Sequence, residues 1–349
     1  MLIHQSYKFR IYPTKDQITL INKTIGCCRF VYNHFLAEEN TSYKNNKKSI
    51  GFAGCCRQLT QLKKQDNTLW LKEVDSTALQ STLRNLDTAR QNFFQKRAKF
   101  PKFKSKKHPV QTYTTKNNHD SIAVHGNLLQ VPKLGLVKFA KSHEVEGCIL
   151  SATLRRASSG NYFVALLCEK ENSPLSLTGS GLGLDLGLTD LATTQNDEKI
   201  SRQRFTKKVE QCLAKAQHVL ARRVKGSNNW YKQKRVVARI HEQIANQRLD
   251  SLHKETTKLV KNHDLFCLET LGIKDLLAEK FEDETNKNKA QRTKNIADAS
   301  WGKFVSLLSY KCQWYGKILI QVDRYFPSTQ LCSVCHKLTG PKKDTTVRK

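Results

Sequence analysis

Two acidic residues lie where the surrounding sequence is apolar, which makes them the first candidates for chemistry. Asp185 interrupts the run Leu184-Asp185-Leu186, and Glu269 ends the compact segment DLFCLE, residues 264–269. A carboxylate is costly to bury unless it is paired or binds a metal ion. If the two segments are parallel neighbouring strands, both carboxylates lie at one end of a sheet, where clustered carboxylates bind divalent cations for phosphodiester hydrolysis. Alternatively, each acid pairs with a Lys or Arg side chain or lies at a sheet edge.

The second candidate is the pair Cys332 and Cys335, which has the spacing of metal ligands. A C-x-x-C after the turn sequence FPSTQ is typical of one knuckle of a zinc ribbon, here residues 326–336. A closed structural zinc site needs four ligands, and the residues that follow offer only His336 in addition. A redox-active pair would need a strand-to-helix context that is absent here. The other cysteines are expected to be reduced thiols.

A strongly basic segment covers residues 95–107, QKRAKFPKFKSKK, in which seven of 13 residues are basic and none is acidic. Most charge runs of this kind are solvated, flexible loops. The interleaved Phe100 and Phe103 favour a loop that grips phosphates and uses aromatic side chains as anchors. The candidate nucleic-acid-binding residues of this loop are Lys96, Arg97, Lys99, Lys102, Lys104, Lys106 and Lys107.

A second basic segment, residues 201–261, is predicted to form two long helices that break near residues 226–229. It contains 16 Lys and Arg against 4 Asp and Glu, a net charge of +12. Here the candidate nucleic-acid-binding residues are Arg222, Arg223, Lys232, Lys234, Arg235 and Arg239.

The charge of the whole chain points to a polyanionic partner. Its 60 Lys and Arg exceed its 30 Asp and Glu by 30. Nucleic acid fits this excess because each phosphate contact releases condensed counterions. An anionic membrane surface fits less well, since the basic residues are spread over several segments. No run is apolar and long enough to span a membrane, and the first residues lack the apolar core of a secretory signal. We therefore expect a cytoplasmic, nucleoid-associated protein.

The elements that must position these residues follow from periodicity and turn signals, and they predict an α+β multidomain fold. The N-terminal region is predicted over 1–175, with β-strands and a helical insertion at about 15–107. The second domain is predicted over 176–349. The expected elements are a strand at 1–12, helices at 15–39, 49–64 and 76–99, an antiparallel sheet at 110–170, strands at 264–269 and 317–323, a mobile stretch at 277–295 and a helix at 296–315.

Taken together and in this order, several segments resemble the OrfB/TnpB family, which insertion sequences encode. The N-terminal part contributes YKFRIYPTKDQ, GCCRFVYNHFL and FPKFKSKK. The C-terminal part contributes GLDLGLTDLA, KGSNNWYKQKRVVARIHEQIANQRLDSLHK, LETL, NIADASWGKFVSLLSYKCQWYG and DRYFPSTQLCSVC. The resemblance covers essentially the whole chain.

The resemblance implies an N-terminal half that binds guide RNA and double-stranded target DNA. It also implies a C-terminal RuvC-like nuclease domain with an RNase H fold, in a context of DNA transposition. Base pairing with the guide would then carry the sequence specificity. The first catalytic Asp of the family falls on Asp185 and its catalytic Glu on Glu269, both as Mg²⁺ ligands.

This sequence also departs from the family pattern. The family continues to a second C-x-x-C and to a third catalytic Asp, and residue 349 precedes both. The resemblance therefore implies a weakly bound or lost Mg²⁺ and an incomplete zinc site. Three functions stay open: an RNA-guided DNA endonuclease, a nuclease-dead guided repressor of transcription, and a decayed transposase fragment. We expect guided binding, with cleavage reduced at least ~10³-fold relative to a version with the full C-terminus.

Overall fold

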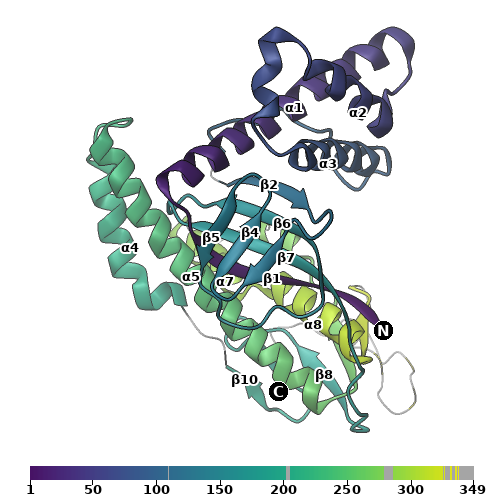
Figure 1. The fold of residues 1–349 in the computed structure, drawn as a ribbon. Helices are drawn as coiled ribbons and strands as arrows, with labels where there is room; N and C mark the ends of the chain where they lie inside the picture. Colours follow the sequence, from purple (N-terminus) through teal and green to yellow (C-terminus); the bar gives the residue numbers. More distant parts are fainter. Residues whose placement is uncertain are drawn as a thin grey trace. The chain divides into compact units, whose positions relative to one another are not determined.

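The computed structural model describes residues 1–108, 110–201, 205–278 and 286–324, together with residues 326, 331, 335 and 337. The chain forms two compact units. The first comprises Met1–Glu171 and Leu220–Arg239, and the second comprises Asn172–Val219 and Ile240–Lys349. Residues 220–239, which a boundary at 175/176 would assign to the second domain, thus group with the first unit. The fold is mixed α+β, with an N-terminal helical region and a sheet in each unit (Figure 1).

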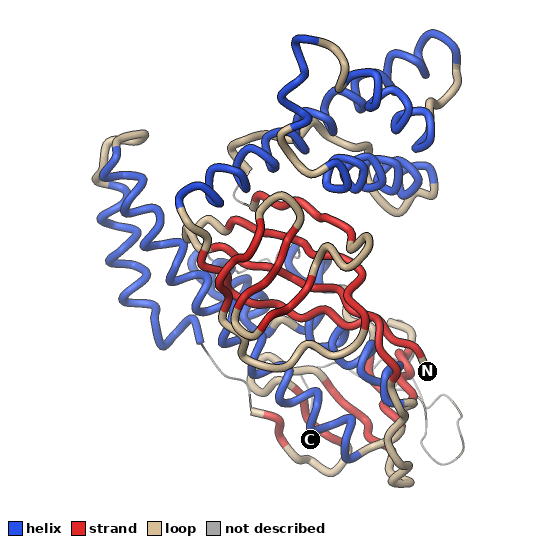
Figure 2. The backbone as a smooth tube through the Cα atoms, viewed as in Figure 1, coloured by secondary structure: helices blue, strands red, loops and turns tan. Residues whose placement is uncertain are grey.

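The first unit is built on a seven-stranded sheet with the order β2-β6-β7-β1-β5-β4-β3, in which all pairings are antiparallel. Figure 2 shows the strands in red. Strand β1 (Leu2–Tyr12) alternates strictly, so that Ile3, Tyr7, Phe9 and Ile11 lie on the buried face. The other strands are β2 (Gln111–Lys116), β3 (Ala123–His125), β4 (Leu128–Val131), β5 (Gly135–Phe139), β6 (Cys148–Arg156) and β7 (Tyr162–Glu171).

A helical insertion separates β1 from β2, as the sequence predicts. Helix α1 (Lys15–Asn46) begins with a capping box, in which the Gln17 amide donates to the Thr14 hydroxyl and the Thr14 amide donates to the Gln17 side-chain oxygen. The insertion continues with α2 (Gly51–Leu62), the 3₁₀ helix η1 (Asp66–Lys72) and α3 (Ser76–Phe94). The buried thiols of Cys27, Cys28 and Cys55 belong to the same hydrophobic core as the sheet.

The second unit contains a five-stranded sheet with the order β10-β9-β8-β11-β12. Strands β8 (Gly181–Asp185), β11 (Leu265–Glu269) and β12 (Ile318–Val322) are parallel to one another, whereas β9 (Ala192–Thr194) and β10 (Lys199–Ile200) pair antiparallel. The buried residues of β8 and β11, among them Leu184 and Phe266, pack with Trp301 and Phe304 in one core.

The helices of the second unit include most of the basic segment 201–261. They are α4 (Phe205–Ala221), α5 (Asn228–Asn262), α6 (Ile273–Ala278), α7 (Asn286–Ala299) and α8 (Trp301–Tyr315), with residues 220–239 of this stretch grouping with the first unit. The stretch at 277–295 was predicted to be mobile, but from residue 286 onward it belongs to helix α7. Two ion pairs hold it: Arg248 of α5 to Asp298 at 2.5 Å, and Glu210 of α4 to Lys294. Among the described residues, no helix is long and apolar enough to cross a membrane.

Candidate carboxylate site and nucleic-acid interface

Asp185 and Glu269 are the last residues of β8 and β11, which are hydrogen-bonded parallel neighbours. Leu184 pairs with Leu268, so that the two acids follow directly on a matched pair. Because the parallel strands run in the same direction, both carboxylates lie at the C-terminal ends of these strands, at the same end of the sheet. The two segments are therefore parallel neighbouring strands, which is the arrangement that a joint carboxylate site requires.

Neither carboxylate has a protein partner within the described part of the chain. Asp185 and Glu269 are exposed, and neither makes a hydrogen bond or ion pair there. Both strands lie in the interior of the sheet order. The alternatives of pairing with a basic residue or lying on an edge strand therefore do not describe these acids. In a chain with a net charge of +30, two adjacent unpaired carboxylates are available for a cation.

The turn after β8 is fixed by contacts that follow from the sequence. Leu182 and Leu184 point into the core, and strand alternation places Asp185 on the opposite side. The indole Nε1 of the buried Trp301 donates to the Gly187 carbonyl at 3.2 Å. At Gly187 a side chain would approach the Asp190 carbonyl at 3.2 Å, which makes a larger residue unfavourable. The backbone next to Asp185 is therefore held by α8.

The donor set fits a single hard cation with oxygen ligands. Mg²⁺ binds through one or two carboxylates and keeps several waters, so Asp185 and Glu269 are sufficient protein ligands for one ion. No group of three or more His, Cys, Asp or Glu residues that could hold a metal occurs among the described residues. Asp323 follows β12, the next strand of the sheet, but it does not complete such a group.

The predicted zinc knuckle at 326–336 falls largely outside the described residues. Cys332 is one of the residues that the structure does not describe, and Cys335 is an exposed free thiol. The pairing of Cys332 with Cys335 around a metal stays a prediction.

All seven basic side chains of the loop at 95–107 are exposed. The loop is nevertheless anchored to helix α1. The Asn33 side chain donates from Nδ2 to the Lys104 carbonyl at 3.0 Å and accepts from the Lys104 amide at 2.7 Å. The Lys104 ammonium lies 4.0 Å from the centre of the Tyr32 ring, and desolvation lowers the pKa of Lys104. Lys104 is thus an anchor of the loop, whereas the sequence marked it only as a phosphate ligand.

The aromatic residues of the loop differ in their contacts. Phe100 packs edge-on against Phe93 of α3 at a centroid distance of 5.1 Å. Phe103, which directly precedes the anchor, is 60% exposed. The loop therefore presents an aromatic side chain to solvent between Lys102 and Lys104, the arrangement that stacking on a nucleic acid requires.

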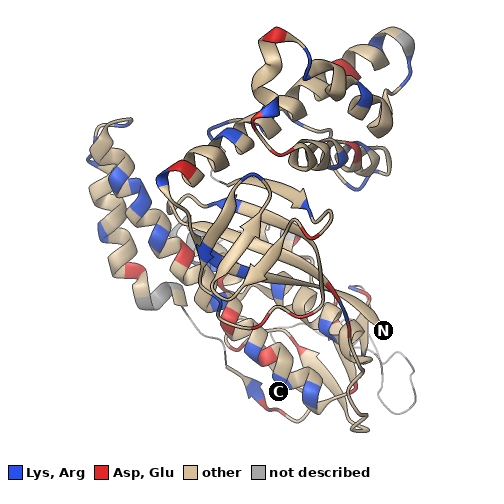
Figure 3. Cartoon of the chain, viewed as in Figure 1, with Lys and Arg blue, Asp and Glu red and all other residues tan. Residues whose placement is uncertain are grey.

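The six basic candidates around the break between α4 and α5 are also exposed. Figure 3 shows Lys and Arg positions, coloured blue, along both helices. Lys234 lies over the Trp230 ring at 4.8 Å. Arg239 donates from Nε to the carbonyl of Ser159, in the turn between β6 and β7, at 3.4 Å. The sequence did not predict this contact, since it joins residues 80 positions apart.

A further basic groove on α5 was missed in the sequence. It is lined by residues 253–262, and among them are Lys254, Lys258 and Lys261. Their spacing of four and three residues places them on one helix face, which was a readable signal. Because the whole segment 201–261 is basic, the spacing of these three lysines did not stand out from the other basic residues.

Comparison with protein families gives three matches along the chain. A model described as "Probable transposase" (OrfB_IS605) matches residues 165–279. The helix-turn-helix domain model of the same family matches residues 1–48, which here form β1 and α1. The Cas12f1-like TNB domain model matches residues 301–349.

Similar proteins cover nearly the whole chain. A protein of Streptomyces pristinaespiralis, whose name describes an RNA-guided DNA endonuclease, is 34% identical over 97% of this chain and 82% of its own length. InsQ of Escherichia coli K12, with a name of the same kind, is 32% identical over 95% of this chain and 83% of its own length. A solved chain from the "Cas12f1-sgRNA-target DNA complex" has the same fold, with a TM-score of 0.62, 11% identity, and coverage of 97% of this chain and 92% of that one.

Proposed function

Because the chain belongs to the OrfB/TnpB family of transposon-associated RNA-guided DNA endonucleases, we propose that it binds a guide RNA, which directs it to double-stranded DNA. We also propose that it hydrolyses this DNA, and the observation that carries the hydrolytic part is the pair Asp185 and Glu269, unpaired at the ends of neighbouring parallel strands. The solved chain with the same fold comes from a complex with guide RNA and target DNA. This supports guide RNA and DNA as partners of the present chain. An association with the nucleoid is part of the proposal.

The second unit is proposed to be an RNase H-like, RuvC-type nuclease domain. The strand order β10-β9-β8-β11-β12, with an antiparallel hairpin on one side and parallel strands on the other, supports this assignment. The proposed zinc ribbon would include Cys332 and Cys335 and lies within the residues that the TNB model matches.

In the proposed chemistry, Asp185 and Glu269 would hold Mg²⁺. When bound, the ion supplies an activated water and stabilises the leaving oxygen of a phosphodiester. The two side chains provide the anionic oxygens, and their exposed position at the strand ends leaves the solvent side open for a DNA strand. A second ion needs additional ligands, which would come from water, from the scissile phosphate or from residues outside the described ones.

The basic surfaces would bring the polyanions to this unit. The loop at 95–107 and the region around the α4–α5 break are proposed to contact phosphates, with Lys104 positioning the loop. Contacts of this kind fix orientation and contribute salt-dependent affinity without reading sequence.

A second candidate function is guided binding without cleavage, in which the protein represses transcription by occupying DNA. It is favoured by the observation that no third His, Cys, Asp or Glu joins Asp185 and Glu269 in a metal-binding group among the described residues. A decayed transposase fragment would show neither guided DNA binding nor DNA cleavage.

The proposal is tested by sequencing the RNA that copurifies with the chain and then offering it matched DNA with Mg²⁺. Asp185→Asn should abolish cutting and leave guided binding intact. Asp197→Asn is the matched control, because Asp197 is an exposed turn residue with φ +59°, a conformation that Asn adopts readily. Guided binding without cutting in the unmodified chain would select the repressor, and random RNA without guided binding would contradict both functions.

A further inference from the structure

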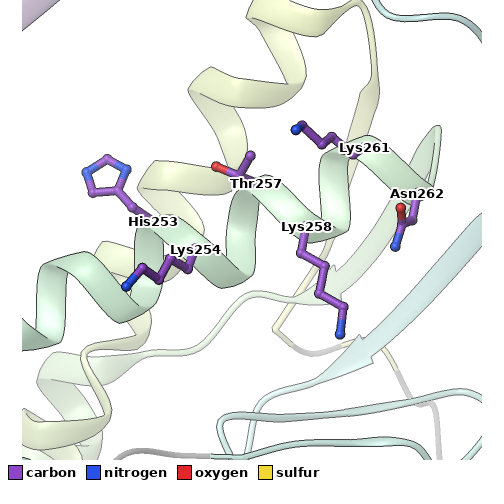
Figure 4. A pocket seen from close by; sticks show the side chains of 6 residues that line it. All are labelled: His253, Lys254, Thr257, Lys258, Lys261 and Asn262. Atoms are coloured by element: carbon purple, nitrogen blue, oxygen red, sulfur yellow. The ribbon is translucent and has the colours of Figure 1, made fainter. Parts of the chain in front are cut away.

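A groove on the C-terminal half of α5 carries charge that the proposed carboxylate site does not use. It has a volume of about 500 Å³. Figure 4 shows its lining, which comes entirely from one helix: His253, Lys254, Thr257, Lys258, Lys261 and Asn262.

The ammonium groups of this groove are incompletely neutralised. Lys254 pairs with Asp250 at 2.7 Å, an exposed contact along the helix. Lys258 and Lys261 have no acidic partner in the described part of the chain and are exposed. Like charges one helical turn apart destabilise a helix. An anion bound along this face would remove that repulsion.

The buried ammonium of Lys311, on the neighbouring helix α8, adds to the positive charge near the groove. Lys311 of α8 is 5% exposed and donates from Nζ to the His253 carbonyl at 2.8 Å and to the hydroxyls of Thr256 and Thr257 at 2.7 Å. No carboxylate of the described residues pairs with it. Burial lowers the pKa of Lys311 to about 8. A buried cation with neutral partners only is unusual, since burying a charge without a counter-charge is costly.

Thr257 connects the buried ammonium to the groove. Its hydroxyl oxygen accepts from Lys311, so its own hydrogen must point elsewhere. No acceptor takes this hydrogen among the described residues, and Thr257 lines the groove. The hydroxyl is therefore available to donate to a ligand oxygen.

His253 experiences the same positive field. Its pKa is lowered by burial, then by Lys311 and Lys303 of α8, against an opposing contribution from Asp250. The lowered pKa favours the neutral imidazole next to these cations.

We propose that this groove binds phosphate groups of a nucleic-acid backbone, with Lys254, Lys258 and Lys261 as ion-pair donors and Thr257 as a hydroxyl donor. This deepens the proposed function and rests on it for the class of polyanion. A membrane surface is the poorer occupant, because membrane-surface helices need a large exposed apolar face. In this half of α5 the apolar side chains of Leu252, Leu259 and Val260 are buried in the core of the second unit instead. The strand can belong to a guide RNA or to a target DNA, since both carry the same phosphodiester.

Lysine footprinting of the full chain tests the proposal. The protein is treated with an amine-reactive N-hydroxysuccinimide ester, alone, with a 20-nucleotide oligo(U) RNA, or with a 20-nucleotide oligo(dT) DNA. Modification of Lys258 and Lys261, read by mass spectrometry, should fall several-fold in at least one arm, while the exposed Lys199 of β10 stays unchanged. Protection by RNA alone assigns a guide strand, protection by DNA alone a target strand, and protection by both a general backbone site. No selective protection in either arm overturns the proposal.

A variant series tests the phosphate contacts themselves. The triple change Lys254→Gln, Lys258→Gln and Lys261→Gln should reduce the slope of log affinity against log salt for the single strand by about 2, at ~0.7 per lost contact. Lys199→Gln is the control with no expected change. Thr257→Val should weaken binding by about fivefold, the value of one hydrogen bond, and Thr257→Ser should restore it. An unchanged slope in the triple variant contradicts the proposal.

These measurements use unmatched homopolymers, so they are independent of guided recognition. Protection without guided DNA binding would count against the proposed function and leave the groove site standing. Guided binding without protection of Lys258 and Lys261 would contradict the groove site and leave the proposed function standing.

Discussion

The side-chain amide of Asn33 bonds both backbone groups of Lys104, although 71 residues separate the two in the sequence. A loop with seven basic residues is thus fastened to helix α1 at one point. Anchoring of this kind reduces the conformational freedom that the loop would lose on binding a nucleic acid.

Asn33→Ala should release the loop. Loss of two hydrogen bonds of about 1 kcal/mol each raises the population of the detached loop by roughly 5- to 30-fold. Trypsin should therefore cleave within residues 96–107 faster by a similar factor, because cleavage follows the open population. Asn22→Ala is the control, since Asn22 lies on the same helix and accepts from Arg156 instead. Equal cleavage rates in the two variants would show that Asn33 does not hold the loop.

The buried ion pair of Glu39 and Arg90 should dominate the stability of the helical insertion. Its atoms are 2.5 Å apart, and the side chains are 3% and 9% exposed. Glu39 also accepts from the backbone amides of Ile50 and Gly51 at the start of α2, where the Ser49 hydroxyl accepts from Gly51 as well. Glu39→Ala leaves the buried charge of Arg90 without an acidic partner, although Arg90 still donates to the Ser49 hydroxyl. The change should destabilise this region by about 3–5 kcal/mol.

Hydrogen exchange of the α2 and α3 amides measures this loss directly. Adding Arg90→Met to Glu39→Ala should recover part of it, because the unpaired charge is removed. The exposed pair Lys23–Glu73 provides the comparison, and Glu73→Ala should change protection little. A large loss from Glu73→Ala, or no recovery in the double variant, would contradict this account.

Acid should weaken the second unit through Asp264. The Lys317 ammonium, with the backbone amides of Gly179 and Thr178, lowers the pKa of Asp264 from 3.8 to about 2. Because the folded-state value is the lower one, the stabilisation is present above pH ~5 and is lost as the pH falls through 4 toward 2.

The measurement is the urea midpoint of the protein and of Asp264→Asn between pH 2 and pH 6. The difference between the two midpoints should be largest at pH 5–6 and should shrink toward pH 2. Asp197→Asn, an exposed acid of the same unit, should show little difference at any pH. A difference for Asp264→Asn that does not change with pH would exclude this linkage.

Local patterns in the sequence predict most of the helices and strands, and the elements that they do not predict have physical reasons. The alternation in residues 1–12 and the helical spacing after Pro13 predict β1 and the start of α1, because each pattern reflects a single buried face. The stretch 286–299 is nearly all polar, and its contacts with the rest of the unit are long-range ones that no local pattern reveals. They are ion pairs to α4 and α5 and the burial of Ile296 and Ala299 in the core.

The candidate site was predictable for a different reason. Charged residues at the ends of apolar strands are rare enough to mark Asp185 and Glu269, but only pairing of β8 with β11 brings them together. The role of Lys104 could not be predicted, since Asn33 and Tyr32 lie far from it in sequence. Neither could the support that Lys311 gives to Thr257 from another helix.

The central claim is that a guide RNA directs this chain to DNA and that Asp185 and Glu269 form the hydrolytic centre. Its most direct test is a plasmid assay with the copurified RNA and Mg²⁺ or Mn²⁺, in which guided binding and strand cutting are measured in the same mixture. We predict binding only to the plasmid that matches the guide, and any cutting of that plasmid should be lost in Asp185→Asn and in Glu269→Gln while binding persists. Guide-independent binding, or cutting that survives both substitutions, would contradict the account.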